Sequence, residues 1–459
     1  MKTKLLAAVL IWFCVFGNTV FAQKENYVWY FGDHAGLDFN SGSPVALTNG
    51  MLNTNEGCSS ISDANGNLLF YTDGIKVWDR NHNQMPNGDS LAGHLSSTQS
   101  ALIVPFPGSD SLYYIFTTYA YPFPVIDEPF TYSVVDMSLN NSNGDITIKN
   151  NLLLNQAAEK LAGVKHSNGI DTWVVVTGVD CDTIYSYLVT AGGLSSNPVK
   201  NNSGWVFSGG DAAGYMKISP DGSKLACAGA QYDYAVVFDF DPSTGFITNP
   251  VIFSYPFWAH PYGIEFSKSG HYLYGTCGGG THYLFQWDVI GDSLIIQIPV
   301  STTSKGALQM GPDGKIYLAK NSQELGVINN PELPGIQCNY VDSAFYLSGK
   351  NSRLGLPDFI SSYFLTAGIN TNNPPLNQLT ISPNPATDKI YISFPATTSE
   401  NITTKIYSIT GEVVYEQINK SAAPITKFQI PVFNISNGIY FLSVRTGREV
   451  VTRKIVVNH

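Results

Sequence analysis

Short runs of alternating apolar and polar residues recur along most of the chain, most clearly within residues 214–241. The three runs there are Tyr215–Ser219, Lys224–Gly229 and Tyr234–Phe240. In the third run Val236, Phe238 and Phe240 share one face, which is typical of a strand with one buried side. Pro220-Asp221-Gly222 predicts a tight hairpin between the first two runs, because glycine adopts positive φ at little cost. The stretch therefore predicts a three-stranded antiparallel sheet.

Related units recur at intervals of roughly 40–60 residues, a period that is typical of propeller blades. The six complete units begin at Gly57, Ser100, Leu161, Gly214, Tyr262 and Gly306. We attribute the longest interval to insertions at Tyr121–Pro129 and Asn140–Asn155. A sheet this small cannot bury both faces alone, so the units must stack against one another.

Two fragments remain at the ends of this region. Tyr27–Leu47 resembles a unit without its first strand, and Arg353–Phe364 begins like a unit and then stops. Closing the ring leaves no exposed sheet edge. We therefore predict an all-β fold, a seven-bladed β-propeller over residues 23–365. Its last blade is closed by both ends, with Arg353–Phe364 as the inner strand beside Tyr27–Phe31.

The two termini differ from the repeated region. Lys2, Lys4, the apolar run Leu5–Phe16 and Val20-Phe21-Ala22 predict a signal peptide over residues 1–22, and the run is too short to span a membrane. Residues 366–378 are polar with paired prolines, which predicts a linker. Clean alternation over residues 379–459 predicts a small antiparallel β-sandwich.

Charge and composition exclude some classes of partner and cofactor. The formal net charge is −10, and the sequence contains no cluster of Lys and Arg residues. Both features argue against a nucleic-acid partner. The five cysteines after the signal peptide are widely spaced, and the scattered histidines have no metal-ligand spacing. We expect no metal, no cofactor and no transmembrane segment.

The C-terminal region carries several motifs in a fixed order. They are Ile381–Asp388 (ISPNPATD), Ile406–Val414 (IYSITGEVV), Asn437–Leu442 (NGIYFL) and Lys454–Val457 (KIVV). This region closely resembles the type A C-terminal sorting domain of the Bacteroidetes type IX secretion system. The resemblance implies export through the periplasm, contact of residues 379–459 with the secretion machinery, and release or attachment at the outer-membrane surface.

Residues 27–364 resemble a group of Bacteroidetes extracellular propeller proteins. The matching stretches are Trp29–Gly32, Leu37–Phe39, Glu56–Cys58, Ser97–Pro105, Gly326–Pro331 and Arg353–Pro357. The resemblance implies fold and location more than chemistry. More remotely, the Ser-Pro-Asp-Gly units are similar to lactonase-type propellers.

One set of polar residues carries the candidate site. Residues that enter the innermost strands of a propeller ring one mouth of its central channel. Alignment of the units and the closing fragment places these residues there: Glu56, Gln99, Glu159, Lys160, His260, Lys305 and Arg353. With Tyr119, Tyr215, Tyr262 and Trp258 as aromatic walls, the ring predicts a ligand-binding cleft for a sugar or small anion. The alternative is that opposite charges pair there and only close the ring.

Two functions remain open at this point. The first is a secreted or surface binding module for a carbohydrate, peptide or envelope component. The second is a lactonase-like or other hydrolytic propeller, with Glu56 or Glu159 as base and His260 as acid. No hydrolase, metalloprotease or phosphate-loop motif decides between them.

Overall fold

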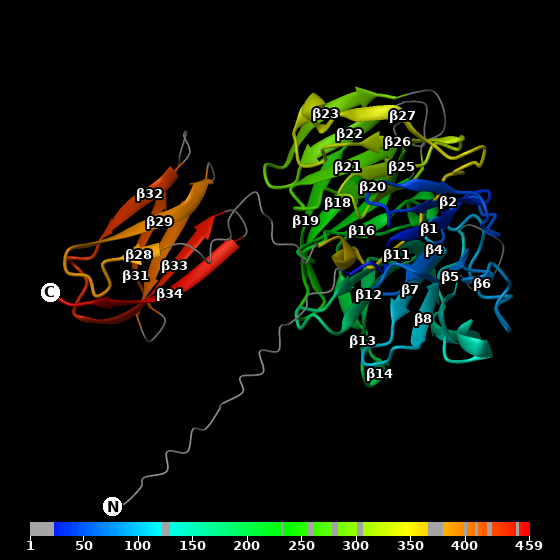
Figure 1. Cartoon of the computed structure of the whole chain (residues 1–459), viewed down its shortest axis with the longest axis horizontal. Coiled ribbons are helices and arrows are strands. Elements are labelled where there is room, and N and C mark those ends of the chain that lie inside the picture. The colour runs from blue at the N-terminus through cyan, green and yellow to red at the C-terminus, as the bar shows by residue number, and fades with distance from the viewer. Residues whose placement is uncertain are drawn as a thin grey trace, which may run out of the picture. The chain divides into compact units, whose positions relative to one another are not determined.

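The computed structural model divides the chain into two compact units, residues 1–367 and 368–459 (Figure 1). It describes residues 23–121, 129–230, 233–255, 260–277, 283–300, 306–365, 380–398, 402–408, 412–419, 425–446 and 449–459. The predicted signal peptide and linker lie outside the described residues. Among the described residues, both units are all-β, and the helical turns are short 3-10 turns in the first unit.

The described residues of the first unit form seven antiparallel sheets that follow one another along the chain. The first three contain β1 (Val28–Phe31), β2 (Ala35–Asp38) and β3 (Val45–Leu47); β4 (Ser59–Ser62), β5 (Leu68–Thr72) and β6 (Val77–Asp79); and β7 (Ala101–Pro105), β8 (Leu112–Thr117), β9 (Phe130–Asp136) and β10 (Asp145–Leu154). The fourth contains β11 (Ala157–Lys165), β12 (Thr172–Gly178), β13 (Thr183–Thr190), β14 (Gly193–Leu194) and β15 (Val199–Asn202).

The remaining three sheets each have four strands. They contain β16 (Met216–Ile218), β17 (Lys224–Gly229), β18 (Tyr234–Asp241) and β19 (Phe246–Ser254); β20 (Pro261–Phe266), β21 (Tyr272–Cys277), β22 (Tyr283–Asp288) and β23 (Ser293–Pro299); and β24 (Leu308–Met310), β25 (Ile316–Leu318), β26 (Glu324–Ile328) and β27 (Tyr340–Tyr346). The 3-10 turns are η1 (Asn140–Ser142), η2 (Gly209–Ala212), η3 (Gly335–Cys338) and η4 (Ser361–Phe364).

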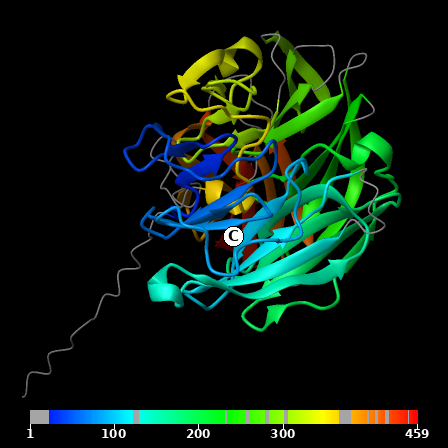
Figure 2. The ribbon, with the colours of Figure 1, turned by 90° about the vertical axis from the view of Figure 1, so that its right-hand side faces the viewer.

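The sheets surround a common centre, so the predicted propeller fold is confirmed (Figure 2). Their innermost strands β1, β4, β7, β11, β16, β20 and β24 contact one another in chain order. The last sheet meets the first where the ring of Trp29 packs edge-on against Tyr317, with centroids 5.7 Å apart. A backbone bridge between Asp33 and Asn351 joins the same two ends of the ring.

Local sequence explains the hairpins. Ile218 ends β16 and Lys224 begins β17, and between them Gly222 takes φ +74° and donates to the carbonyl of Ser219. The predicted turn is therefore confirmed. Apolar residues of adjacent sheets then pack against one another. One such cluster joins Val164, Trp173 and Val175 of the fourth sheet to residues of the fifth, which are Met216, Ile218, Leu225, Cys227, Val236, Phe238 and Phe240.

The outer strands β10, β19, β23 and β27 were not predicted from the sequence. Asn140–Asn155, expected as an insertion, instead contains η1 and the whole of β10. These strands lie at sheet edges, and many of their apolar side chains are exposed, as for Leu152 and Phe246. An exposed edge strand lacks the buried face that produces a clear period of two, so its sequence resembles that of a loop.

The prediction that Arg353–Phe364 forms an inner strand beside Tyr27–Phe31 is wrong. The sheet of β1 contains only β1, β2 and β3. Residues 353–364, hereafter the central segment, instead form parallel bridges from Pro357 to Cys58 and from Ile360 to Gly163. These partners belong to different sheets, so the central segment fills the middle of the ring rather than extending one blade.

The second unit contains two antiparallel sheets. One has β28 (Thr380–Ser382), β29 (Lys389–Thr398) and β32 (Ile425–Pro431); the other has β30 (Ile402–Tyr407), β31 (Val413–Asn419), β33 (Gly438–Thr446) and β34 (Glu449–Val457). One apolar cluster is shared between the sheets and includes Ile390, Ile430, Ile406 and Leu442. This unit therefore has a core of its own.

Candidate functional site: the filled channel and its mouth

The central segment starts beside the last sheet, passes residues 55–58, which lead into β4 of the second sheet, and then enters the ring. The amide of Ala307 donates to the carbonyl of Leu354 over 2.7 Å, and the amide of Leu354 donates to Asn55 over 2.9 Å. A Cβ atom on Gly355 would lie 1.7 Å from the backbone oxygen of Glu56, so only glycine fits here. The segment continues through buried Leu356 and Ile360 to η4.

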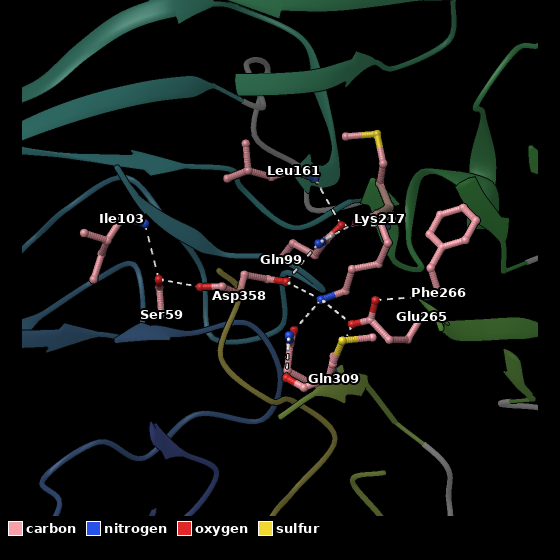
Figure 3. Close-up of polar contacts among 11 residues, drawn as sticks. Ser59, Gln99, Ile103, Leu161, Lys217, Glu265, Phe266, Gln309 and Asp358 are labelled. Carbon is pink, nitrogen blue, oxygen red and sulfur yellow. Dashed lines mark hydrogen bonds and ion pairs between the residues drawn. The ribbon is translucent and has the colours of Figure 1, made fainter. Parts of the chain in front are cut away.

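Asp358 lies at the middle of this path and joins four of the surrounding sheets through one network (Figure 3). Its Oδ1 accepts hydrogen bonds from Lys217 Nζ over 3.2 Å and from Gln99 Nε2 over 3.1 Å. Lys217 Nζ also donates to Gln309 Oε1 over 2.6 Å and lies 3.7 Å from Glu265 Oε2. Ser59 Oγ donates to the Asp358 carbonyl over 2.8 Å.

The network holds two carboxyl groups and one ammonium group almost out of contact with water. Lys217 and Glu265 are each 5% exposed, and Asp358 is 2% exposed. Burial raises the pKa of Asp358 to about 6, although Lys217 opposes the shift. Burial likewise raises the pKa of Glu265. The centre of the ring is thus a structural polar core and not an open channel.

At the mouth, the structure brings Glu56, Glu159 and Tyr262 together. Glu56 is half-buried, and burial together with the neighbouring Glu159 carboxyl raises its pKa to about 8. The Tyr262 hydroxyl favours the ionised form and limits this shift. Tyr262 packs edge-on against the fully buried Tyr215, with ring centroids 5.6 Å apart.

Glu159 is fixed by its surroundings. Its Oε2 accepts from the amide and hydroxyl of Thr98, both over 2.7 Å, and its Oε1 accepts from the amide of Tyr121 over 2.7 Å. The residue is 2% exposed, and burial raises the pKa of its carboxyl. Both carboxylate oxygens are therefore committed to the protein.

The side chains of Lys160 and Gln99 also form hydrogen bonds to backbone groups within the protein. Lys160 Nζ donates to three carbonyl oxygens, those of Ala213, Gly214 and Ala228, over 2.5–2.9 Å. Burial lowers its pKa to about 8. Gln99 Oε1 accepts from the amides of Leu161 and Met216. These two side chains stabilise the channel wall, which matches the structural alternative better than a ligand contact.

The other predicted residues lie at the rim. His260 is half-buried in a left-handed conformation, and its amide donates to Asp233 Oδ1 over 3.2 Å. The Arg353 side chain is 38% exposed and lies 3.7 Å from Asp33. Tyr119 packs against His94, with ring centroids 4.9 Å apart. Lys305 and Trp258 fall outside the described residues.

Sequence reasoning missed the residues that close the channel. Asp358 interrupts an apolar stretch, Leu354–Ile360, and Lys217 interrupts the apolar strand β16. A lone charge within an apolar run is a signal for a buried ion pair. Their partnership could not be read from the chain, because 141 residues separate them.

In the part of the chain that the structure describes, no three or more His, Cys, Asp or Glu side chains are placed to hold a metal ion. None of the helices described there has the length and hydrophobicity needed to cross a bilayer.

Comparison with known proteins identifies the second unit. Residues 380–458 match the family described as the secretion system C-terminal sorting domain. The chain therefore carries a sorting domain of the type IX secretion system, which directs it to the cell surface or the extracellular space. No curated protein matches the chain in sequence.

Solved structures with a similar outline have low sequence identity. A putative 6-phosphogluconolactonase from Bacteroides fragilis is 12% identical, covers 88% of this chain and 98% of its own, and has a TM-score of 0.40. A protein from Lactobacillus plantarum is 14% identical over 72% of this chain and 99% of its own, with a TM-score of 0.45. The periplasmic gluconolactonase PpgL from Pseudomonas aeruginosa is 12% identical over 79% and 97%, with a TM-score of 0.37. Similarities at this level transfer no activity to the chain.

Proposed function

We propose that this exported propeller is a binding protein that holds a polar, uncharged ligand, of the carbohydrate class, at the mouth of its filled channel. The observation that carries the proposal is that the charged residues predicted at the mouth differ in their exposure to solvent. Glu159 and Lys160 are buried and bonded to the protein, whereas Glu56 stays half-exposed beside Tyr262. Glu56 is thus the acidic group of that ring that a ligand can reach.

The state of Glu56 favours a hydroxyl-bearing ligand. A pKa of about 8 keeps this carboxyl mostly protonated at neutral pH, so it can both donate and accept a hydrogen bond. The exposed side chain of Arg353 adds donors at the rim. Since the central segment fills the ring, the ligand is confined to the surface of the mouth.

Hydrolysis is the second candidate, and one observation favours it. A protonated carboxyl beside a second carboxyl, here Glu56 beside Glu159, is an arrangement that supports general acid catalysis. Against it, both carboxylate oxygens of Glu159 already accept hydrogen bonds from Thr98 and Tyr121, so this carboxyl is not available as a base.

Two substitutions at one position distinguish the candidates. The mature chain is screened on a neutral glycan array, and affinities are measured by calorimetry beside a panel of lactones and esters. Glu56→Gln keeps a neutral hydrogen-bonding group and should retain most of the affinity, whereas Glu56→Ala should lose roughly tenfold. The exposed Asp110→Asn is the matched control.

A hydrolase gives another pattern, because the amide of Glu56→Gln cannot donate a catalytic proton. Turnover by the wild type that Glu56→Gln abolishes would establish the hydrolytic candidate. Binding that is unchanged in Glu56→Ala would place the ligand elsewhere and overturn the proposal.

A further inference from the structure

A second candidate site lies away from the mouth, in a groove between the outer parts of two neighbouring sheets. It has a volume of about 480 Å³, within the range of small-ligand sites. One side is formed by β9 and β10, and the other by β13, β14 and the turn that leads to β15. None of the predicted mouth residues lines it.

Irregularities in both sheets create the groove. β14 pairs with β13 only at Val189 and Thr190, and β15 pairs with it only from Thr183 to Ser186. The chain leaves the sheet between these two pairings, in the turn 195–198. Across the groove, β10 shifts register beside Asn151 and again after Leu152. Bulges of this kind re-aim side chains and are common beside binding sites.

The lining combines aromatic faces with hydrogen-bonding groups. Tyr132, Tyr185 and Tyr187 contribute rings, and Asn151, Ser195 and Asn197 contribute amides and hydroxyls. Two of the rings are held in place: Asn151 Nδ2 donates to Tyr132 Oη over 2.5 Å, and Tyr187 Oη donates to the carbonyl of Leu153 over 3.3 Å. Leu152, on the rim, is 53% exposed.

Charge narrows the class of ligand. Lys200 is the one charged side chain among the described residues that line the groove, and no carboxylate joins it. Its Nζ lies 5.9 Å from the centroid of the Tyr185 ring, so the positive charge stands over an aromatic face. On a chain with a net charge of −10, this groove is locally suited to a single anionic group.

We propose that this groove binds a short acidic saccharide. The apolar faces of sugar rings would stack on the half-buried Tyr132 and Tyr185, whereas the buried Tyr187 forms the floor of the groove. The sugar hydroxyls would bond to Asn151 and Ser195, and the carboxylate or sulfate would meet Lys200. Export places the protein where such polysaccharides occur, outside the cell. The inference does not depend on the function proposed for the mouth.

Calorimetry on the mature full chain tests the proposal, with trigalacturonate as the acidic probe and its neutral counterpart, a galactose trisaccharide. The wild type should prefer the acidic probe roughly tenfold. Lys200→Met should abolish this preference but keep the neutral affinity. Leu152→Glu should reduce acidic binding, because it adds a negative charge at an exposed rim position that does not affect folding.

The control is Lys149→Met, which removes an exposed lysine of β10 that pairs with Asp89 outside the groove. Thermal melting establishes that each variant is folded. Glu56→Ala should leave the affinity for trigalacturonate unchanged even where it weakens a neutral ligand at the mouth, so failure of the mouth site and failure of the groove are separable. The proposal is overturned if the wild type and Lys200→Met bind trigalacturonate with equal affinity. It is also overturned if the wild type binds no saccharide at all, or binds an acidic peptide in place of the saccharide.

Discussion

Lys217 Nζ lies 3.2 Å from Asp358 Oδ1, which ties the fifth sheet of the propeller to the segment that fills the ring. Both residues are nearly inaccessible to water. Glu265 and Gln309 bring the sixth and seventh sheets to the same ammonium group. The central segment is therefore held by charge-assisted bonds as well as by apolar packing.

Asp358→Ala should strongly destabilise the propeller unit. It leaves Gln99 Nε2 without its carboxylate acceptor and removes one of the two carboxylates beside Lys217. Breaking a buried pair in this way costs about 3 kcal/mol in the free energy of unfolding. Denaturant titration of the mature chain measures it, with exposed Asp110→Ala as the control. Equal midpoints for the two variants would show that the segment is held by packing alone.

Stability should also depend on pH through Asp358. Its pKa in the folded state, about 6, is above the ordinary value of 3.8 for an aspartic acid, so the folded protein binds the proton more tightly than the unfolded chain. The contribution of Asp358 to stability is then greatest below about pH 4 and decreases as the pH rises to about 6, by of the order of 2–3 kcal/mol. The raised pKa of Glu265 acts in the same direction.

Asp358→Asn removes this titration but keeps the shape of the side chain. The melting temperature of the wild type minus that of Asp358→Asn should therefore be larger at pH 4 than at pH 7. Carboxyls remote from Asp358 titrate equally in both proteins and cancel from the difference. Glu265 does not cancel, because the Asp358 carboxylate contributes to its raised pKa, so the difference reports these two coupled carboxyls. A difference that stays constant between these pH values would mean that Asp358 is not the titrating group.

The sequence predicted the strands whose side chains are buried on at least one face. β16, β17 and β18 fall within a residue or two of the expected ranges, because their core faces impose a period of two. The edge strand β10 was missed because most of its side chains meet water. The central segment was placed in the wrong sheet because its parallel bridges to Cys58 and Gly163 leave no local pattern.

Prediction from the sequence was limited in the same way at the mouth of the channel. The position of each residue in its repeated unit is enough to predict that Glu56, Glu159 and Tyr262 lie together, since all three precede or begin inner strands. Register does not establish which side chain faces water, because neighbouring residues of a strand point to opposite faces. Glu159 and Lys160 are adjacent, yet one bonds to Thr98 and the other to Ala213, and neither remains available at the surface.

Lys160→Met should destabilise the propeller unit by about 3 kcal/mol, because it leaves three carbonyl oxygens without their donor. Methionine has a similar length and fills the same space, so the loss reports the hydrogen bonds rather than a cavity. Lys149→Met is the matched control, since its exposed pair with Asp89 is worth less than about 1 kcal/mol. If both variants lost a similar free energy of unfolding, the three hydrogen bonds of Lys160 would not be a major source of stability.

Asn384→Ala should impair export. In the second unit, Asn384 Nδ2 donates to the carbonyl of Lys454 over 3.1 Å, and its Oδ1 accepts from the amide of Val456 over 2.8 Å. The side chain thus holds the last strand, β34, against the ISPNPATD motif. Loss of both bonds costs about 1–2 kcal/mol and loosens the C-terminal end of the sorting domain.

The measurement is the ratio of surface and medium protein to periplasmic protein in the native host. Deletion of residues 380–459 should leave the protein in the periplasm, Asn384→Ala should shift the ratio part of the way, and exposed Asn434→Ala should leave it unchanged. If Asn384→Ala were exported like the wild type while the deletion was retained, the domain would be needed but this clamp would not. Normal export of the deletion variant would contradict the assignment of the second unit as the sorting signal.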